Sequence, residues 1–238
     1  MVKEGKKYLV GDIHVKGNEI FGDEEIKDGL ELTRNRAYSQ NLMRRDVVGI
    51  QEKYYNRGYI MCRVYPEPVV DKNTGRIDIT YTVKEDRLVY VNKVLIAGNT
   101  KTRDKVIRRE LEVYEQELYN GVKLKKGVRN LFRLDYFEDV KVDTIRGASE
   151  DSMVLKVEVA EKPTGAFTFG GGYSSVEDAF TMFSISQRNF RGLGQVLQAR
   201  AQLGGVTNKF SLSFTEPWLF DIPLSATVEA YDWEVDYD

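Results

Sequence analysis

Few side chains in this sequence have the type and spacing that catalysis or metal binding requires. The 238 residues include one histidine, His14, and one cysteine, Cys62, which excludes an intrachain disulfide and a cysteine-based metal cluster. We interpret His14 as a structural residue and Cys62 as a packed or half-exposed thiol in a strand. Gly170, Gly171 and Gly172 could suggest a phosphate-binding loop, but no helix N-terminus follows them. We therefore expect a protein that is not an enzyme and has no cofactor, catalytic or metal site.

Charge is distributed unevenly along the chain. The net charge of −2 gives no indication of a nucleic-acid partner. Up to Pro163 there are 31 basic and 28 acidic residues, a difference of +3, and after it there are 4 basic and 9 acidic residues, a difference of −5. We therefore expect the two parts of the chain to occupy different solvents. No segment approaches the roughly 20 apolar residues of a membrane-spanning helix, and residues 1–7 lack a signal-peptide core. If the protein is exported, we expect this sequence to be part of a longer precursor.

The first two thirds of the chain contain an internal repeat. Residues 13–18 are echoed by residues 94–99, an offset of 81 positions, and residues 77–85 are echoed by residues 153–161, an offset of 76. Similarity at a nearly fixed offset indicates two copies of one structural unit.

Within the first copy the apolar period changes from that of a strand to that of a helix and back. A strand that ends at Gly17-Asn18 is followed by a short helix over about residues 23–32 and by a longer helix. Strands over residues 60–64 and 77–83 complete the copy. The longer helix has Ser39 at its N-cap and carries apolar residues at helical spacing: Met43, Val47, Ile50 and Tyr54.

The second copy predicts the same order of elements. Its short helix covers about residues 103–113, and its strands cover about residues 137–142 and 153–159. Asn120 stands at the N-cap of its longer helix. Gly58 and Asp135 stand at the ends of the two longer helices, where left-handed residues are common. The apolar residues of the second longer helix are Leu124, Val128, Leu131 and Phe132. Each copy therefore reads β-α-α-β-β, an α+β unit with two helices on one face of a small sheet.

This ordered pattern resembles the POTRA (polypeptide-transport-associated) domain. The resemblance covers residues 8–162 and includes the Gly-Asn after the first strand and the Gly-Tyr or Asp-Tyr before the second. It implies one POTRA domain over residues 8–86 and another over residues 87–162. An extended client could add a strand to the edge of such a sheet through main-chain hydrogen bonds, although an ordinary sheet edge is the alternative interpretation. The candidate edge residues are Ile60, Cys62, Val64, Val140 and Val142.

After Pro163 the sequence alternates between apolar and polar residues, which is typical of strands with two unlike faces. Five such runs occur between residues 164 and 230. Strands of about ten residues predict a transmembrane β-barrel, and a soluble β-sandwich is the alternative. Scarce charge and a polar face rich in Ser, Thr and Gln favour the barrel. Five strands are too few to close one, so residues 163–238 would form antiparallel strands of an incomplete barrel with exposed edges.

The alternation changes parity in the fifth run. Tyr231, Trp233 and Val235 are odd-numbered, whereas the preceding apolar residues are even-numbered. Either a β-bulge or emergence of the strand from the bilayer through an aromatic rim would explain the change.

Three segments resemble motifs of outer-membrane protein assembly factors of the BamA type. They are residues 163–173, which are similar to the first barrel strand of that family, residues 187–194, similar to its second turn, and residues 215–220, similar to a Pro-aromatic segment. The resemblance implies a location in the bacterial outer membrane, with the POTRA domains in the periplasm. It also implies folding and insertion of β-barrel proteins, with unfolded outer-membrane β-barrel proteins, outer-membrane lipoproteins and the lipid bilayer as partners.

The same resemblance assigns two groups of residues. The first barrel strand of the family is a gate that receives the last strand of a client, and the matching positions are Thr164, Phe167, Thr168, Phe169, Gly170, Gly171, Gly172 and Tyr173. Adjacent glycines favour a flexible strand, although they could also relieve crowding in a curved one. The charged helix of the last POTRA domain docks a lipoprotein, or is simply solvated, and the matching positions are Arg108, Arg109, Glu110 and Glu115.

Two other functions fit the same features less well. A polypeptide transporter for two-partner secretion also has two POTRA domains and a related barrel, and further repeats before Tyr8 would argue against it. A soluble periplasmic scaffold with a β-sandwich tail would be stable in water without detergent.

Overall fold

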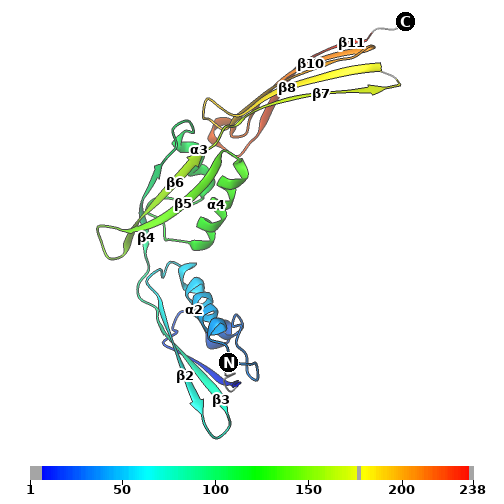
Figure 1. The fold of residues 1–238 in the computed structure, drawn as a ribbon. Helices are drawn as coiled ribbons and strands as arrows, with labels where there is room; N and C mark the ends of the chain where they lie inside the picture. The colour runs from blue at the N-terminus through cyan, green and yellow to red at the C-terminus, as the bar shows by residue number, and fades with distance from the viewer. Residues whose placement is uncertain (1–6, 176–177, 236–238) are drawn as a thin grey trace. The chain divides into compact units, whose positions relative to one another are not determined.

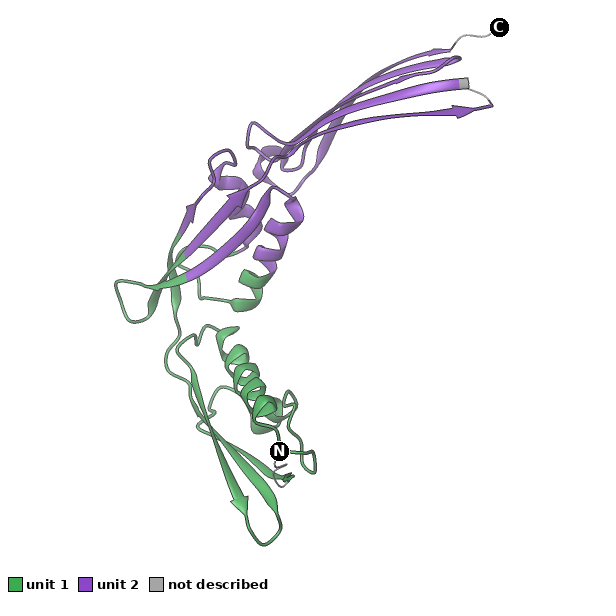
Figure 2. Ribbon diagram, in the orientation of Figure 1, with its two compact units in different colours: residues 1–94, 113–125, 144–155 green, residues 95–112, 126–143, 156–238 purple. Residues whose placement is uncertain are grey.

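The computed structural model describes residues 7–175 and 178–235. It contains two three-stranded sheets with helices and one five-stranded sheet (Figure 1). The chain divides into two compact units, residues 1–94, 113–125 and 144–155 in one, and residues 95–112, 126–143 and 156–238 in the other (Figure 2). In the described residues no helix is long and apolar enough to cross a membrane.

The first copy of the repeat, here called the first module, runs from Leu9 to Lys84 and has the predicted β-α-α-β-β order. Its sheet order is β1-β3-β2, with β1 parallel and β2 antiparallel to β3. The central strand β3 buries every second side chain, and the inner face of α2 covers the sheet with Met43, Ile50 and Tyr54. Burial of each such side chain contributes roughly 1.5–3 kcal/mol. The elements are β1 Leu9–Lys16, α1 Asp23–Lys27, α2 Gln40–Tyr55, β2 Arg63–Asp71 and β3 Arg76–Lys84.

The first helix, α1, is shorter than the predicted helix over residues 23–32. It ends at Lys27, and the Asp28, Gly29 and Leu30 amides still donate to carbonyls of this helix, whereas the Glu31 and Leu32 amides have another acceptor. The carboxylate of Asp46, 2% exposed, accepts hydrogen bonds from the Glu31 and Leu32 amides at 2.5 and 3.1 Å and from the Tyr81 hydroxyl at 3.0 Å. A buried carboxylate on α2 therefore holds an extended segment where the sequence suggested a further helical turn.

The second module repeats the order, with sheet order β4-β6-β5. Gly127 occupies the position that corresponds to Asp46, and a methyl group there would clash with the backbone of Leu111. The first helix of this module therefore packs directly on the second and continues to Leu111, close to the predicted end. The elements are β4 Tyr90–Ala97, α3 Asp104–Leu111, α4 Gly121–Leu134, β5 Phe137–Arg146 and β6 Ser152–Glu161.

The predicted helix ends have mixed outcomes. Asn120 caps α4, since its side-chain oxygen accepts the Lys123 amide at 3.0 Å, and Gly58 and Asp135 have the positive φ values expected of them, 94° and 61°. Ser39 stands at the N-cap of α2 but makes no side-chain capping bond. Phe132, expected on the apolar face of α4, is 46% exposed.

The prediction of a strand over residues 60–64 is wrong. β2 begins at Arg63 and runs to Asp71, so Ile60 and Cys62 lie before it, in a turn closed by the Cys62 amide and the Tyr59 carbonyl. The turn points the Cys62 side chain into the core, where it is 1% exposed. Burial raises the pKa of this thiol to about 11, with a smaller effect of Glu85 and Asp86, so the thiol is unreactive at neutral pH.

Residues after Pro163 form one antiparallel sheet with the strand order β11-β10-β9-β8-β7. Each of the five predicted runs is a strand, and Figure 1 shows them side by side. In the described residues the sheet is open, with β7 and β11 at its edges. The strands are β7 Gly165–Ser174, β8 Asp178–Phe190, β9 Gln195–Leu203, β10 Thr207–Glu216 and β11 Ala226–Val235, with the 3-10 helix η1 Leu219–Asp221 before the last.

The change of parity in β11 is not caused by a bulge. β10 and β11 pair without a register shift from Thr207–Val235 to Glu216–Ala226. Residues paired across antiparallel strands share a face, so Tyr231 and Trp233 lie on the polar face, opposite Ser211 and Lys209. The bulge alternative is therefore wrong, and the aromatic rings belong to the polar side of the sheet.

Candidate functional site

Strand β7 is one edge of the five-stranded sheet, because β8 is its only neighbour in the described residues. Its ten residues pair in register with β8, from Gly165–Gln187 to Ser174–Asp178. Thr164 precedes the strand and is also tied to β8, since Gln187 donates to its hydroxyl at 2.6 Å. The main-chain groups on the other side of β7 have no strand beside them in the described part of the chain, which leaves a template for a further strand.

The predicted gate residues on β7 fall on two faces. Phe167, Phe169 and Tyr173 are 66, 61 and 78% exposed on the apolar face, and the Phe169 ring lies 5.0 Å from that of Phe183 on β8. Thr168 and Gly170 pair with Ser184 and Met182 and belong to the polar face.

The three glycines of β7 are not equally crowded. A methyl group at Gly172 would lie 2.8 Å from the Phe180 ring, and one at Gly171 would lie 3.0 Å from the Phe180 carbonyl oxygen. A methyl group at Gly170 would meet nothing within 4 Å. Crowding therefore explains the absence of a side chain at Gly172, but it does not explain Gly170.

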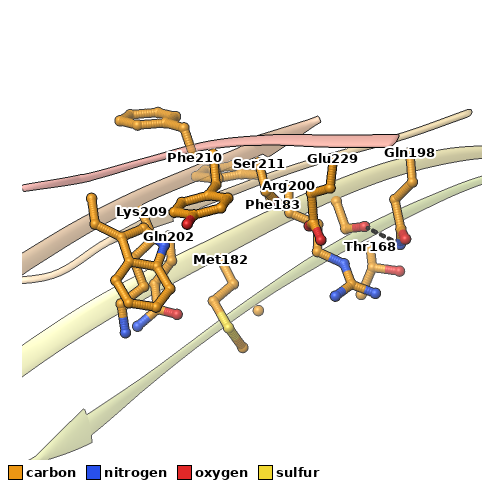
Figure 3. Close-up of a pocket in the computed structure, with 15 residues that line it drawn as sticks. Thr168, Met182, Phe183, Gln198, Arg200, Gln202, Lys209, Phe210, Ser211 and Glu229 are labelled. Atoms are coloured by element: carbon orange, nitrogen blue, oxygen red, sulfur yellow. Dashed lines mark hydrogen bonds between the residues drawn. The ribbon is translucent and has the colours of Figure 1, made fainter. Parts of the chain in front are cut away.

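The polar face of the sheet encloses a hollow of about 850 Å³ (Figure 3). Figure 3 shows Met182, Gln198, Arg200, Gln202 and Lys209 extending to the same side of the strands. Lys209 Nζ lies 5.5 Å from the Trp233 ring centroid, and Gln198 donates to Ser184 at 3.4 Å. The alternation of the sequence predicted this polar face. The grouping of Arg200, Lys209 and Glu229 around one hollow depends on the pairing register of β9, β10 and β11.

The edges of the two module sheets differ in their main-chain donors. β2 is an edge of the first sheet and contains Pro66 and Pro68 at alternate positions. Proline has no N–H group and is tolerated where that position faces away from the neighbouring strand, so the outer edge of β2 lacks two successive donors. β5, an edge of the second sheet, contains no proline. The pattern of residue types did not reveal this difference, because β2 was predicted to end before Pro66.

The predicted edge residues lie in two separate sheets. Val64 and Val140 lie on β2 and β5 with side chains 7 and 9% exposed, and Val142 on β5 is half-buried. Ile60 and Cys62 lie outside β2.

The four predicted docking residues do not behave alike. Arg108 is half-exposed and pairs with Asp104 at 3.5 Å. Glu115 accepts the Val94 amide at 3.0 Å. Arg109 and Glu110 have side chains only 11 and 16% exposed, so they are engaged within the fold.

Arg109 and Glu110 hold Trp218, which follows β10. The Arg109 guanidinium carbon lies 5.0 Å from the Trp218 ring centroid, and the indole N–H donates to the Glu110 carboxylate. Arg109 Nε lies 3.9 Å from Glu110 Oε1, and it is buried without a hydrogen-bond partner in the described part of the chain. Burial lowers the pKa of Arg109 and raises that of Glu110, and in each case the neighbouring opposite charge acts against the shift.

Further hydrogen bonds join the second module to the turn between β8 and β9. The Tyr136 hydroxyl donates to the Arg188 and Gly194 carbonyls at 2.9 and 3.2 Å, and Asn189 donates to the Thr102 hydroxyl at 2.8 Å. Asp135 binds Lys162 and, at 2.8 Å, Arg188. The sequence predicted residues 187–194 only as a turn motif, because residue types do not show that Asn189 is buried in this contact.

Glu161 ends the repeated motif of the second module and closes the loop before α3. Its carboxylate accepts the amides of Thr100, Lys101 and Thr102 at 3.0, 2.9 and 2.6 Å, and the Thr100 hydroxyl at 2.7 Å. Burial raises the pKa of Glu161, but these hydrogen bonds outweigh it and lower the pKa from 4.5 to about 2. Glu85 has the same role in the first module, where it accepts the amides of Glu19 and Ile20.

We expect Glu161→Gln to lower the free energy of unfolding by about 1–2 kcal/mol, because hydrogen bonds to a charged acceptor are stronger than those to an amide. Since the folded-state pKa lies below the unfolded value, this contribution is complete above about pH 4.5 and is lost as the pH falls towards 2. Urea unfolding of both proteins between pH 7 and pH 2 measures the difference. Glu138→Gln, an exposed change on β5, is the control and should have no effect. A difference that stays constant with pH would contradict the assignment.

In the residues that the structure describes, no group of three or more His, Cys, Asp or Glu side chains is placed to hold a metal ion.

Comparison with known proteins agrees with the resemblance described from the sequence. The family model "POTRA: Surface antigen variable number repeat" matches residues 8–86 and 89–162. An outer membrane protein assembly factor BamA from Nitratidesulfovibrio vulgaris is 32% identical over 97% of this chain and 30% of its own length. The chain spans about 30% of the length of the curated relatives it matches.

Two solved structures are similar to the fold. The crystal structure of BamA from Haemophilus ducreyi lacking POTRA domains 1-3 matches with a TM-score of 0.84 and 22% identity, over 96% of this chain and 43% of that one. The structure of Haemophilus influenzae BamA POTRA3-5 matches with a TM-score of 0.59 and 26% identity, over 66% of this chain and 63% of that one. The predicted POTRA-like α+β modules are confirmed, whereas the transmembrane barrel and the domain boundaries stay predictions.

Proposed function

Because this chain belongs to the POTRA family, we propose that it is part of an outer-membrane assembly factor that folds and inserts β-barrel proteins by pairing their strands with its own exposed sheet edges. Relatives that are outer membrane protein assembly factors support a location in the outer membrane. We propose that the two modules lie in the periplasm and that the five-stranded sheet crosses the membrane. The observation that carries the mechanism is the edge strand β7 with its uncrowded Gly170.

An apolar face on the sheet supports its place in the membrane. Phe169, Phe183 and Phe210 lie on this face together with Leu212 and Val228, and in the described chain they are 38–72% exposed. The opposite face carries Ser, Thr and Gln residues around the hollow of Figure 3. One apolar and one polar face are what lipid on one side and a wet lumen on the other require.

Strand pairing at β7 would suit many clients. Every residue of a client offers the same N–H and C=O groups, so recognition by the main chain does not depend on a particular sequence. In lipid each unpaired main-chain group costs several kcal/mol. Pairing with the free edge of β7 therefore supplies a driving force for insertion, and the client's own strands replace this pairing as its barrel closes.

The module edges are second candidates for client binding. The intact donor row of β5 supports strand addition there, with Val140 and Val142 on the strand. Pro66 and Pro68 argue against the same use of β2. For lipoprotein docking, Arg108 is the predicted residue on α3 that remains half-exposed. The buried contacts of Arg109 and Glu110 support a role inside the fold, and Glu115 stays a docking candidate on an exposed loop.

Cysteine crosslinking in the full-length protein tests the β7 proposal. Single cysteines at Thr168 and Gly170 should form disulfides with the C-terminal strand of a stalled client in one register. The buried thiol of Cys62 will not compete. Scrambling the last strand of the client should abolish the crosslink. Its absence at both positions, with client expression confirmed, would favour a secretion transporter that passes a partner polypeptide through its own pore.

Gly170→Val should reduce crosslinking at Thr168 about fivefold, which corresponds to the roughly 1 kcal/mol range of strand propensity. A Cβ atom at this position meets nothing within 4 Å, and valine stiffens β7 and strengthens its existing pairing with β8. Ala166→Val, on the same strand outside the glycine run, is the matched control and should leave the yield unchanged. Gly172→Val should instead reduce the amount of folded protein, because it collides with the Phe180 ring. An unchanged yield for Gly170→Val would make the glycines structural.

A further inference from the structure

Three exposed cations gather at the end of the five-stranded sheet that adjoins α3. Lys101 and Arg103 flank Thr102 in the loop before α3, and Arg191 lies in the turn between β8 and β9. The Arg103 amide donates to the Gly192 carbonyl at 2.8 Å, and a methyl group at Gly192 would clash with the Lys101 carbonyl. The loop and the turn are therefore in direct contact, which brings these three exposed residues to one region of the molecule.

The carboxylates near this surface are already engaged. Asp104 binds Arg108 at 3.5 Å and Asn99 at 3.0 Å, Asp221 binds Lys105 at 2.8 Å, and Glu161 accepts the loop amides. Lys101, Arg103 and Arg191 have no ion-pair partner among the described residues. The surface therefore carries an unbalanced positive charge.

An aromatic side chain projects from the neighbouring connection between β10 and β11. Phe220 is 84% exposed and has a φ of 58°, which is unusual for a bulky residue. The residues on either side are fixed, since Trp218 is held by Arg109 and Glu110 and Asp221 by Lys105. The fold thus holds an apolar ring in water in an unfavourable backbone conformation, an arrangement that points to a function for the ring.

We propose that Lys101, Arg103, Arg191 and Phe220, here called the basal rim, bind the anionic headgroups of the phospholipid leaflet that meets this end of the sheet. Cations attract an anionic membrane surface, and aromatic rings favour the boundary between headgroups and acyl chains. The inference rests on the proposed function, because only a sheet that crosses the membrane brings its end to a headgroup layer. Charge complementarity and the exposed aromatic ring of Phe220 together favour a lipid surface over an acidic protein.

Fluorescence quenching in nanodiscs tests this inference with the full-length protein. A fluorophore on Ile222→Cys, in a Cys62→Ser background, reports on the rim without altering it, since Ile222 is 52% exposed and two residues from Phe220. In discs that contain both lipids, phosphatidylglycerol with a nitroxide on its headgroup should quench it much more than phosphatidylcholine with the same nitroxide at equal content. A label at Val69, 63% exposed on β2, should not be quenched.

Removing the positive charges of the basal rim should reduce the quenching of the label at position 222. Each of Lys101→Gln, Arg103→Gln and Arg191→Gln should lower the ratio of quenched to unquenched label about fivefold, the equivalent of roughly 1 kcal/mol for one cation at a membrane surface. Phe220→Ser should lower it as well. Lys72→Gln, at the tip of the β2–β3 hairpin, is the matched control and should have no effect.

A label at Phe169 separates this inference from the proposed function. Quenching there by nitroxides on acyl chains shows that the sheet is inserted. If that label is quenched and the rim label does not respond to phosphatidylglycerol or to the glutamine variants, headgroup binding is wrong and the proposed function stands. If the Phe169 label is not quenched, both fail. Loss of an acidic protein partner in the glutamine variants, with unchanged lipid quenching, would also overturn headgroup binding.

Discussion

Arg109→Met is expected to lower the free energy of unfolding by about 3–5 kcal/mol, because it leaves a buried carboxylate without its counter-charge. Glu110 lies beside Arg109 with a side chain 16% exposed, and the Trp218 ring loses the cation that covers it. Urea unfolding of the chain in detergent, followed by Trp218 fluorescence with Trp233 replaced by Phe, measures the loss. We also expect the connection between β10 and β11 to become less firmly attached to α3, since Trp218 joins the two.

The double variant Arg109→Met, Glu110→Leu is the control for this effect. Removing both charges relieves the uncompensated carboxylate, so the total loss should be only about 1 kcal/mol, the value of the Trp218 hydrogen bond that remains unmade. Glu110→Leu alone should lose at least the Trp218 hydrogen bond, about 1 kcal/mol, so the coupling between the two changes should be at least about 3 kcal/mol. Additive losses would show that the pair is no more than two independent packing residues.

The loss in Arg109→Met should depend on pH in a defined direction. Burial already raises the pKa of Glu110, and Arg109 opposes that shift, so removal of Arg109 raises the pKa further. A carboxyl group whose folded-state pKa exceeds its unfolded value binds a proton more tightly in the folded protein. The variant should therefore regain stability as the pH falls from 7 towards 5, whereas Glu161→Gln shows its pH dependence below 4.5.

Asp46→Ala should have a similarly large effect on the first module, about 4 kcal/mol. The change leaves the amides of Glu31 and Leu32 and the hydroxyl of Tyr81 without an acceptor, and each unsatisfied buried donor costs roughly 1–3 kcal/mol. Hydrogen exchange at the Leu32 amide measures the local part of the loss, and urea unfolding measures the whole.

Tyr81→Phe separates the contributions in the Asp46 site. It removes one donor and keeps the carboxylate and both amide bonds, so it should cost only about 1 kcal/mol. Equal losses in the two variants would show that the hydrogen bond from the Tyr81 hydroxyl, and not the bonds from the Glu31 and Leu32 amides, accounts for the contribution of Asp46.

Much of the fold follows from local chemistry and could be predicted from residue order. Alternation at period two marks β3 and the five strands after Pro163, because each strand has one apolar face. The repeated Gly-Asn predicts a turn in each module. The helical spacing of Met43, Ile50 and Tyr54 predicts a helix with one apolar face. The family resemblance is confirmed by the match to the POTRA model, since its motifs depend on turns and caps that are local in sequence.

The tertiary structure decided what depends on partners distant in sequence. Asp46 and Gly127 occupy equivalent positions in the two modules. The carboxylate of Asp46 binds the extended segment after α1, whereas Gly127 lets the backbone at the end of α3 pack against α4. The sequence predicted Arg109 and Glu110 as surface charges, whereas in the structure they contact Trp218 and have little exposure. Sequence alone also could not distinguish Gly170 from Gly172, since only the ring of Phe180 on the neighbouring strand separates an open position from a crowded one.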